Sequence, residues 1–574
     1  MVLTGLLGIW LAYGQFSLVR ASSAPTITAL ADNPDARCAK CHQEIYNRYK
    51  NTPMANASGL AIDGFLPAKF THLESGVSYR ISKDSSGVFL SFEREAVPGS
   101  ADATAIDHAL KGRRELKYFL GSGKRGRTYL FETQGYWFEI PINWYAKKQV
   151  WDMAPGYLNA KEMPLALPVD PGCLRCHASA AQPSLPQARN KYAGVPFLHG
   201  GITCEACHGN PEKHLASSGR ETMLKLGDLQ PAQRDSICLN CHLEGQSAIV
   251  HQGKRLVDFK PGDSIFDYAS FFVHQAEAGS GGRATSQWEA LLQSACKRGS
   301  GDKLTCTTCH DPHSTTDALN QDERIAFYRA KCLQCHGVSG SATASGAEFV
   351  KNHHPENADC ASCHMPRKTS NDIAHEQVTD HRIVRDPSGG YIPPAKTGPL
   401  VTVGAVSING DASNRDLGLA YAQMAAAGDR QAFLRARQLL TEAEKSPVAA
   451  TDSALHAQLG FLNQIAGESE SASREYGSAL VADPNDAFAA GNLALLKAKE
   501  HDLTGAIRLW QMAFQDDPVQ LRAGMNLAIV ECGVGKPAAA LAALERVLEF
   551  SPDNTQAKAL AREIRSDQHR CERR

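Results

Sequence analysis

Cys306-Thr-Thr-Cys309-His310-Asp-Pro-His313 is the stretch that decides the architecture of this chain, because its Cys-x-x-Cys-His pattern occurs seven times. Two thiols three residues apart reach the two vinyl groups of one haem, and the next residue brings an imidazole to the iron. Zinc ribbons also use Cys-x-x-Cys pairs, but they need four ligands and no His directly after each pair. The repetition therefore predicts seven covalently bound haem c groups.

The residues that would hold these groups are read directly from the pattern. Fourteen of the 17 cysteines would form thioether links, and seven of the 21 histidines would be proximal iron ligands. The cysteines are Cys38, Cys41, Cys173, Cys176, Cys204, Cys207, Cys238, Cys241, Cys306, Cys309, Cys332, Cys335, Cys360 and Cys363. The proximal histidines are His42, His177, His208, His242, His310, His336 and His364.

The sixth ligand of each iron decides between electron transfer and substrate binding. His313 cannot reach the opposite face of the ring bound by His310, so we expect it to ligate a neighbouring haem. Further candidate axial ligands are His199, His214, His353, His354, His375, His381, His72 and Met54. We expect His108, His251 and His274 to face solvent, Cys296 to be a buried thiol and Cys532 to fill a helical core.

The length of 574 residues and the changes in residue pattern along the chain predict several domains. Apolar residues alternate with polar ones around residues 77–81 and 88–92, which indicates a β-hairpin. Six motifs share residues 173–364, where so little protein serves each haem that we expect loops and short helices around the porphyrins. The expected segments are 1–31, a signal peptide or anchor; 32–59, the first haem segment; 60–165, a β-rich insert; 166–384, the six-haem core; 385–410, a linker; and 411–570, helical repeats.

The C-terminal repeats are indicated by a 34-residue period, in which Ala472, Tyr476 and Pro484 recur as Ala506, Trp510 and Pro518. That period is typical of tetratricopeptide (TPR) units, each a pair of antiparallel helices. The predicted fold is therefore multidomain: a haem-packed, mainly helical and loop region with a small β-rich insert, followed by an all-α TPR solenoid.

The charge and hydropathy of the chain limit the classes of binding partner that we expect. Lys and Arg number 60 against 61 Asp and Glu, which favours neither nucleic acid nor an acidic membrane. The apolar start MVLTGLLGIWLAY resembles a secretory signal or an N-terminal anchor, and no later stretch suits a membrane span. We expect an exported, periplasmic or otherwise extracytoplasmic protein that meets redox protein partners, with the TPR repeats as a docking surface.

Several phrases of the haem region resemble bacterial multihaem cytochromes of the cytochrome c-552/4 type with C-terminal TPR repeats. The likeness rests on CAKCHQEIYNRYKNTPMANASG, YFLGSGKRGRTYL, PFLHGGITCEACHG, SICLNCHLEG, GDKLTCTTCHDPH, HHPENADCASCHMPR and TDHRIVR, within residues 35–385. The resemblance implies periplasmic electron transfer and no catalytic residue. The alternative is a multihaem reductase of nitrite, hydroxylamine or a sulfur oxyanion, which needs one haem with an open axial position.

Overall fold

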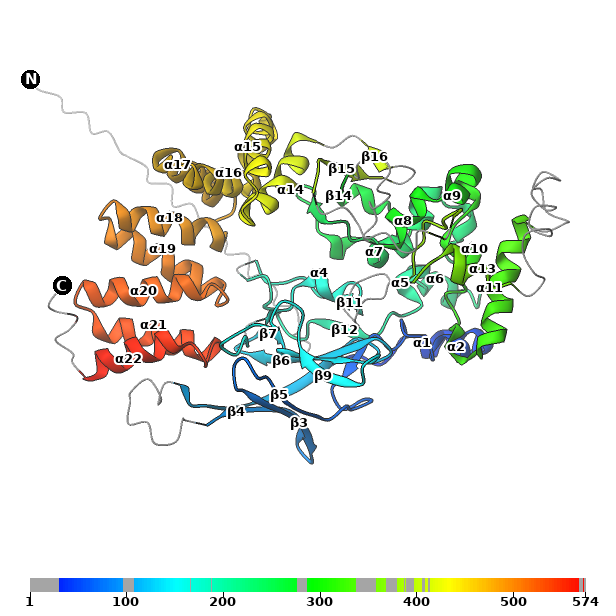
Figure 1. Cartoon of the computed structure of the whole chain (residues 1–574), viewed down its shortest axis with the longest axis horizontal. Helices are drawn as coiled ribbons and strands as arrows, with labels where there is room; N and C mark the ends of the chain where they lie inside the picture. The colour runs from blue at the N-terminus through cyan, green and yellow to red at the C-terminus, as the bar shows by residue number, and fades with distance from the viewer. Residues whose placement is uncertain are drawn as a thin grey trace, which may run out of the picture.

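A computed structural model describes most of the chain in three parts, seen in Figure 1 as a blue-to-cyan sheet, a green region and a yellow-to-red stack of helices. No helix within these parts is long and apolar enough to cross a membrane. The described residues are 30–95, 108–165, 167–186, 188–275, 286–336, 358–367, 379–386, 388, 397–404, 408–410, 413–566 and 571.

A ten-stranded antiparallel sheet forms the N-terminal part and confirms the β-rich insert. Its main path runs β10-β7-β6-β5-β4-β3-β2, while β1 pairs with β5, and β8 pairs with β6 and β9. The strands are β1 (Ser58–Leu60), β2 (Ala68–Thr71), β3 (Ser78–Asp84), β4 (Gly87–Arg94), β5 (Leu110–Leu120), β6 (Gly126–Thr133), β7 (Tyr136–Glu139), β8 (Ile142–Tyr145), β9 (Val150–Met153) and β10 (Leu167–Pro168).

Side-chain alternation explains this sheet. Tyr79 lies opposite Phe92 in the β3–β4 hairpin, and both are buried, as residues on one face of a half-buried strand should be. Gln134 and Gly135 connect β6 to β7 with φ angles of 55° and 82°, the left-handed pair that a two-residue hairpin turn requires.

The region of the cysteine motifs combines short helices with two small sheets. One sheet pairs β11 with β12, and the other has the order β13-β14-β15-β16. The helices are α1 (Asp35–Ala39), α2 (Gln43–Tyr49), α4 (Pro171–Leu174), α5 (Glu205–His208), α6 (Glu212–Ala216), α7 (Pro231–His242), α8 (Gln287–Gln293), α9 (Ala295–Ser300), α10 (Cys306–Cys309), α11 (Gln321–His336) and α13 (Cys360–His364). The strands are β11 (Ala178–Ala181), β12 (Phe197–Gly200), β13 (Ser247–Val250), β14 (Ala269–His274), β15 (Leu400–Val403) and β16 (Ile408–Gly410).

These two sheets were not expected among loops and short helices. β15 comes from the Pro- and Gly-rich stretch that reads as a linker, yet it pairs with β14, and Phe272 lies opposite Thr402. The apolar run Phe271-Phe272-Val273 is too short to distinguish a strand from a helical segment by periodicity. Its strand conformation depends on partners more than a hundred residues further along the chain, which local patterns do not reveal.

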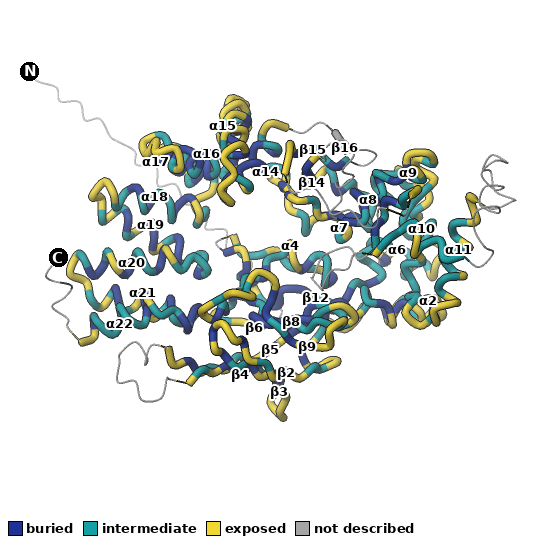
Figure 2. The backbone as a smooth tube through the Cα atoms, viewed as in Figure 1, coloured by how far each residue is buried: buried dark blue, intermediate teal, exposed yellow. Residues whose placement is uncertain are grey.

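The surroundings of most motifs contain little apolar protein core. Among the described residues, no hydrophobic side chain between Phe197 and Leu239, or between Leu292 and Leu400, is buried. α11 has no buried residue over its 16 positions. Figure 2 shows the same contrast: buried positions are frequent in the sheet and the repeats, whereas α6, α10 and α11 have only intermediate and exposed positions.

Within the described residues, nine helices form the C-terminal stack, and the 34-residue period corresponds to successive helix pairs. Ala472, Ala506 and Ala540 are fully buried, so the helices approach closely at these positions. The helices are α14 (Asn414–Ala426), α15 (Arg430–Glu444), α16 (Ser453–Ile465), α17 (Ser469–Ala482), α18 (Ala487–Lys499), α19 (Leu503–Asp516), α20 (Leu521–Gly533), α21 (Pro537–Phe550) and α22 (Thr555–Ser566). The predicted C-terminal helical repeats are confirmed.

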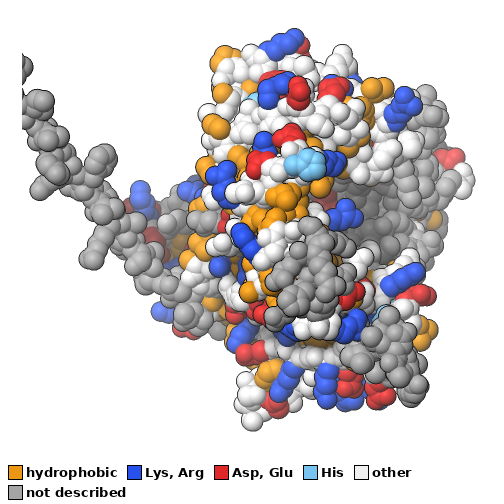
Figure 3. All heavy atoms as spheres, turned by 90° about the vertical axis from the view of Figure 1, so that its left-hand side faces the viewer, with side chains coloured by type: hydrophobic (Ala, Val, Ile, Leu, Met, Phe, Trp, Pro, Cys, Tyr) orange, Lys and Arg blue, Asp and Glu red, His pale blue; other side chains and the backbone are white. Residues whose placement is uncertain are grey.

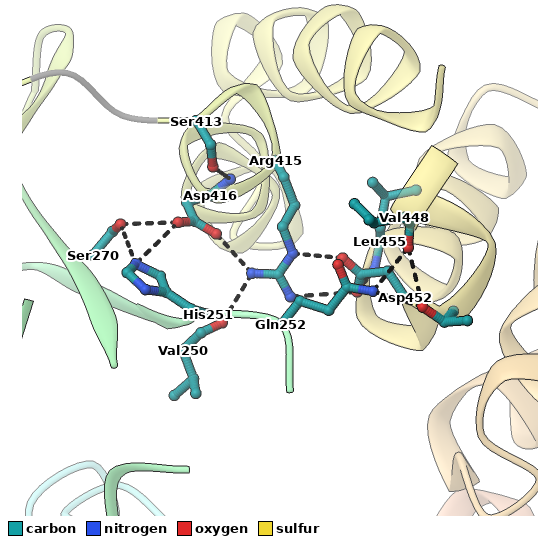
Figure 4. A network of polar contacts seen from close by, with 11 residues as sticks. Val250, His251, Gln252, Ser270, Ser413, Arg415, Asp416, Val448, Asp452 and Leu455 are labelled. Atoms are coloured by element: carbon teal, nitrogen blue, oxygen red, sulfur yellow. Dashed lines mark hydrogen bonds and ion pairs between the residues drawn. The ribbon is translucent and has the colours of Figure 1, made fainter. Parts of the chain in front are cut away.

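The first helices of the stack are tied to the β13–β14 sheet by the polar network in Figure 4. Arg415 donates to Asp416 at 2.6 Å, to Asp452 at 2.6 Å and to the Val250 carbonyl at 2.9 Å. His251 Nε2 lies 3.3 Å from the Asp416 carboxylate. His251 is therefore engaged in the junction, which corrects the expectation that it faces solvent.

The last helices of the stack are tied to the ten-stranded sheet. Phe550, at the end of α21, belongs to the core of that sheet, with ring centroids 5.7 Å from Tyr136 and 5.8 Å from Phe138. Asp553 is completely buried and pairs with Arg94 at 2.5 Å. The helical stack is consequently attached at both ends to the rest of the molecule, as Figure 1 shows.

Candidate haem-attachment sites

Each cysteine motif forms about one turn of helix. In the first motif the amide of His42 donates to the Cys38 carbonyl at 2.8 Å, and the third and fifth motifs close in the same way. Residues three and four apart lie on one face of a helix, so the two thiols and the imidazole of a motif point to the same side. The local conformation therefore matches the prediction from the spacing, in which two thiols and one imidazole hold the same ligand.

Thiols of different motifs lie side by side. The Cys176 thiol donates to the Asn240 carbonyl at 3.6 Å, and the Cys241 thiol donates to the Arg175 carbonyl at 3.7 Å, which interlocks the second and fourth motifs. Four pairs of thiols from different motifs lie close enough for one thiol to shift the pKa of the other: Cys38 with Cys204, Cys176 with Cys241, Cys238 with Cys306 and Cys332 with Cys360. Burial raises the pKa of Cys173 and of Cys332 to about 12. The attachment points are thus packed closely.

Three proximal histidines face a second histidine at a common spacing. A nitrogen–metal bond to imidazole is about 2.0–2.1 Å long, so two rings on opposite sides of one iron have centroids about 6 Å apart. The pairs are His42 with His214 at 6.2 Å, His208 with His313 at 5.9 Å and His310 with His381 at 6.3 Å. Each spacing leaves room for one metal ion between the rings.

Hydrogen bonds orient the second histidine of each pair. A metal-bound imidazole commonly donates its other N–H to a carbonyl or carboxylate, which fixes the tautomer. His214 Nδ1 donates to the Glu221 carbonyl at 2.7 Å, and His381 Nδ1 donates to the Thr379 carbonyl at 2.9 Å. His313 Nδ1 lies 3.5 Å from the Asp311 carboxylate. In all three the Nε2 lone pair is left for a ligand.

Burial lowers the pKa of several of these imidazoles. The effect acts on His208, His242, His310 and His381, and His313 and His42 add to it at His208. A lower pKa keeps the ring neutral near pH 7, and the neutral ring is the form that binds a metal. The electrostatics of the site therefore agree with its geometry.

Other candidate ligands occupy different surroundings. His72 is buried, with Nδ1 at 2.9 Å from Ser75 Oγ and Nε2 at 2.9 Å from the Leu158 carbonyl, so both nitrogens are engaged by protein. His199 is half-buried, and its Nδ1 is a buried atom without a hydrogen-bond partner. Met54 lies half-buried in the turn before β1. His353, His354 and His375 lie outside the described residues.

A second expectation outside the motifs, after that for His251, is wrong. His274 is buried rather than solvent-facing, because it ends β14 and its Nδ1 donates to the Gly398 carbonyl at 2.7 Å. Cys532 is buried in the core of the helical repeats, as expected, and there it forms a disulfide with Cys571, 39 residues further along the chain. Cys296 is a half-buried free thiol.

The residues present fit haem c. Paired thiols precede every proximal imidazole, three imidazole pairs have the spacing of a shared metal, and few of the described apolar side chains around most motifs are buried. His199 adds a buried nitrogen without a protein partner. Each of these features is accounted for by a large, flat, apolar group with a metal at its centre.

Comparisons with known proteins cover separate parts of the chain. The family model described as cytochrome c554 and c-prime matches residues 147–209, and no curated protein matches. A solved structure of MamA from strain AMB-1 is 16% identical and covers 28% of this chain and 82% of its own, with a TM-score of 0.24. A tetratricopeptide repeat protein from Parabacteroides merdae is 16% identical and covers 28% of this chain and 64% of its own, also with a TM-score of 0.24. The chain thus combines a segment similar to cytochrome c554, which implies haem c binding, with C-terminal TPR-like helical repeats.

Proposed function

We propose that this protein is an exported cytochrome that binds seven haem c groups and transfers electrons between protein partners. The observation that carries the proposal is the set of imidazole pairs about 6 Å apart, in which the second ring is held by a hydrogen bond or a carboxylate at Nδ1. When bound, haem c supplies an iron that accepts and releases one electron.

The residues of the chain would hold each group in a defined way. The fourteen motif cysteines form thioethers, and the seven motif histidines bind the irons from one side. His214, His313 and His381 bind the irons of the first, third and fifth motifs from the other side. Two imidazoles leave no position for a substrate, which favours electron transfer at these three irons.

Cysteines of successive motifs lie close to one another, which supports a continuous route for electrons between the haems. Cys38 contacts Cys204, Cys207 acts electrostatically on Cys238, and Cys238 contacts Cys306. Cys335 acts electrostatically on Cys309, and Cys332 lies beside Cys360. These contacts order the motifs as first, third, fourth, fifth, sixth and seventh, with the second beside the fourth through Cys176 and Cys241.

A reductase is the second candidate function, and the fourth motif is the candidate position of its open haem. Burial lowers the pKa of His242, and the nearby charges of His310 and Arg125 add to that effect. A cationic guanidinium near an open axial position would suit an anionic substrate such as nitrite. Electron paramagnetic resonance of the oxidised protein separates the two functions, since a ligand-exchangeable high-spin iron indicates an open position.

Export and docking complete the proposal. Disulfides persist in oxidising compartments, so the Cys532–Cys571 bond supports a periplasmic or other extracytoplasmic location, as does the apolar N-terminal sequence. The helical repeats would bind a redox partner. On the face in Figure 3 both charge signs are scattered, and hydrophobic side chains gather between them.

Intact mass under denaturing conditions tests the proposal most directly, because thioether-bound haem stays with the chain. We expect the mass of the mature polypeptide plus seven haems, together with a Soret band. A mass equal to the polypeptide alone would overturn the proposal, and a smaller number of haems would correct the count.

A further inference from the structure

The turn of residues 379–384 connects two of the candidate haem sites. Its His381 is the ring paired with His310 of the fifth motif, at a centroid distance of 6.3 Å. Its Val384 carbonyl accepts a hydrogen bond from Nδ1 of His364, the proximal histidine of the seventh motif, at 2.7 Å. The amide of Val384 in turn donates to the His364 carbonyl at 2.8 Å.

A buried ion pair holds this turn in shape. Asp380 is fully buried and Arg382 nearly so. The backbone amide of Arg382 donates to the Asp380 carboxylate at 2.9 Å, and its guanidinium Nε donates to both carboxylate oxygens at 3.0 and 2.8 Å. This pair spans His381, so the two charged side chains brace the residue between them.

The backbone of the turn is also constrained. Ile383 has a φ of 49°, a left-handed conformation that a β-branched residue adopts only when its surroundings enforce it. The Asp380 amide donates to the Pro366 carbonyl at 3.1 Å, and the backbones of Arg367 and Thr379 form an isolated antiparallel β-bridge. The strain at Ile383 is therefore offset by contacts on both sides, and it directs the next carbonyl, that of Val384, toward His364.

We propose that Asp380 and Arg382 are positioning residues that set the ligand environment of two irons together, those of the fifth and seventh motifs. The inference rests on the proposed haem binding. The ion pair places the His381 ring opposite His310, and the same turn presents the Val384 carbonyl to His364 Nδ1. A hydrogen bond at Nδ1 makes an imidazole a stronger donor, which favours oxidised iron and lowers the reduction potential.

The Asp380→Asn variant tests this inference, because it keeps the shape of the side chain but removes the negative charge that pairs with Arg382. We expect the full haem count, one additional high-spin iron from the loss of His381 ligation, and an upward shift in potential of a second haem. Potentiometric titration with electron paramagnetic resonance measures both changes. The His364→Met variant identifies the seventh-motif haem in the spectra.

Three further variants separate positioning from general stability. Asp553→Asn removes the charge of another buried carboxylate, that of the Arg94 pair, and we expect it to lower the melting temperature without moving any potential. His381→Ala should convert only the fifth-motif iron to high spin, and added imidazole should restore low spin. Ile383→Gly relieves the strained φ and should preserve both potentials.

Failure of the positioning role and failure of the proposed haem binding give different results. A polypeptide without haem contradicts haem binding itself. A full haem count with Asp380→Asn spectra and potentials identical to the parent protein overturns the positioning role, as does a change at only one of the two irons.

Discussion

At the scale of single residues, the free nitrogen of a histidine separates ligands from structural side chains. His313 has its Nδ1 near Asp311 and its ring opposite His208, whereas both nitrogens of His72 are engaged by Ser75 and Leu158. The sequence singles out His313, because it follows His310 by three residues, and places His72 only among the further candidates. Their partners in space distinguish them.

Replacing His313 by alanine should leave all seven haems attached and convert one iron from low to high spin, because the thioethers and His208 are unchanged. Electron paramagnetic resonance of the oxidised protein measures the conversion. His72→Gln is the matched control and should leave the spectrum unchanged. A normal low-spin signal for His313→Ala would remove this residue from the set of ligands.

A second prediction at this scale concerns His456, whose Nδ1 lies 2.8 Å from Glu475. That hydrogen bond raises the pKa of His456, and burial raises the pKa of nearby Glu444. His456 binds its proton more tightly in the folded state, so its contribution to stability is present below the unfolded histidine pKa of about 6.5 and is lost as pH rises through the folded value.

His456→Gln should therefore lower the free energy of unfolding more at pH 6 than at pH 9. Thermal denaturation at the two pH values measures the difference, and the exposed His501, changed to Asn, is the control. Equal destabilisation at both pH values would contradict the ionic role of His456.

At the scale of elements, α21 links the repeats to the ten-stranded sheet. Phe550 is 2% exposed and packs against Tyr136 and Phe138, so it belongs to the sheet's core although it ends a helix of the repeats. The repeat pattern predicts the helix, and the alternation predicts the strands, but neither pattern predicts that one element completes the core of the other.

Phe550→Ala should lower the free energy of unfolding of the sheet by about 3–5 kcal/mol, the usual cost of removing a buried aromatic ring. Chemical denaturation followed by tryptophan fluorescence measures the loss, since Trp137 and Trp151 lie in the sheet. Phe488→Ala, at a position that is 38% exposed, should cost clearly less. Similar losses for the two variants would contradict the assignment of Phe550 to the core.

At the scale of the whole molecule, the helical repeats form a bridge rather than a free arm. One end is held by Arg415, Asp416 and Asp452 against the β13–β14 sheet, and the other by Phe550 and the Arg94–Asp553 pair. The repeats therefore contribute to the stability of the body that carries the cysteine motifs, in addition to any docking of partners.

Deleting residues 411–574 should destabilise the remaining chain, because it uncovers Tyr136, Phe138 and the apolar side of β13 to β15. We expect a lower melting temperature and aggregation in size-exclusion chromatography. A monomeric truncated protein with the melting temperature of the parent would show that the two attachments carry no stability.

The sequence by itself determined the features that depend on neighbours along the chain: the seven motifs, the β-hairpins and the 34-residue helical period. Tertiary structure alone decided the pairing of His42 with His214, the strand pairing of β14 with β15, the disulfide between Cys532 and Cys571, and the closure of the repeats on the sheet. The physical reason is the sequence separation of the contacts. Haem attachment and helix periodicity depend on residues a few positions apart, whereas an axial histidine or a side chain that covers a core comes from a segment distant in the sequence.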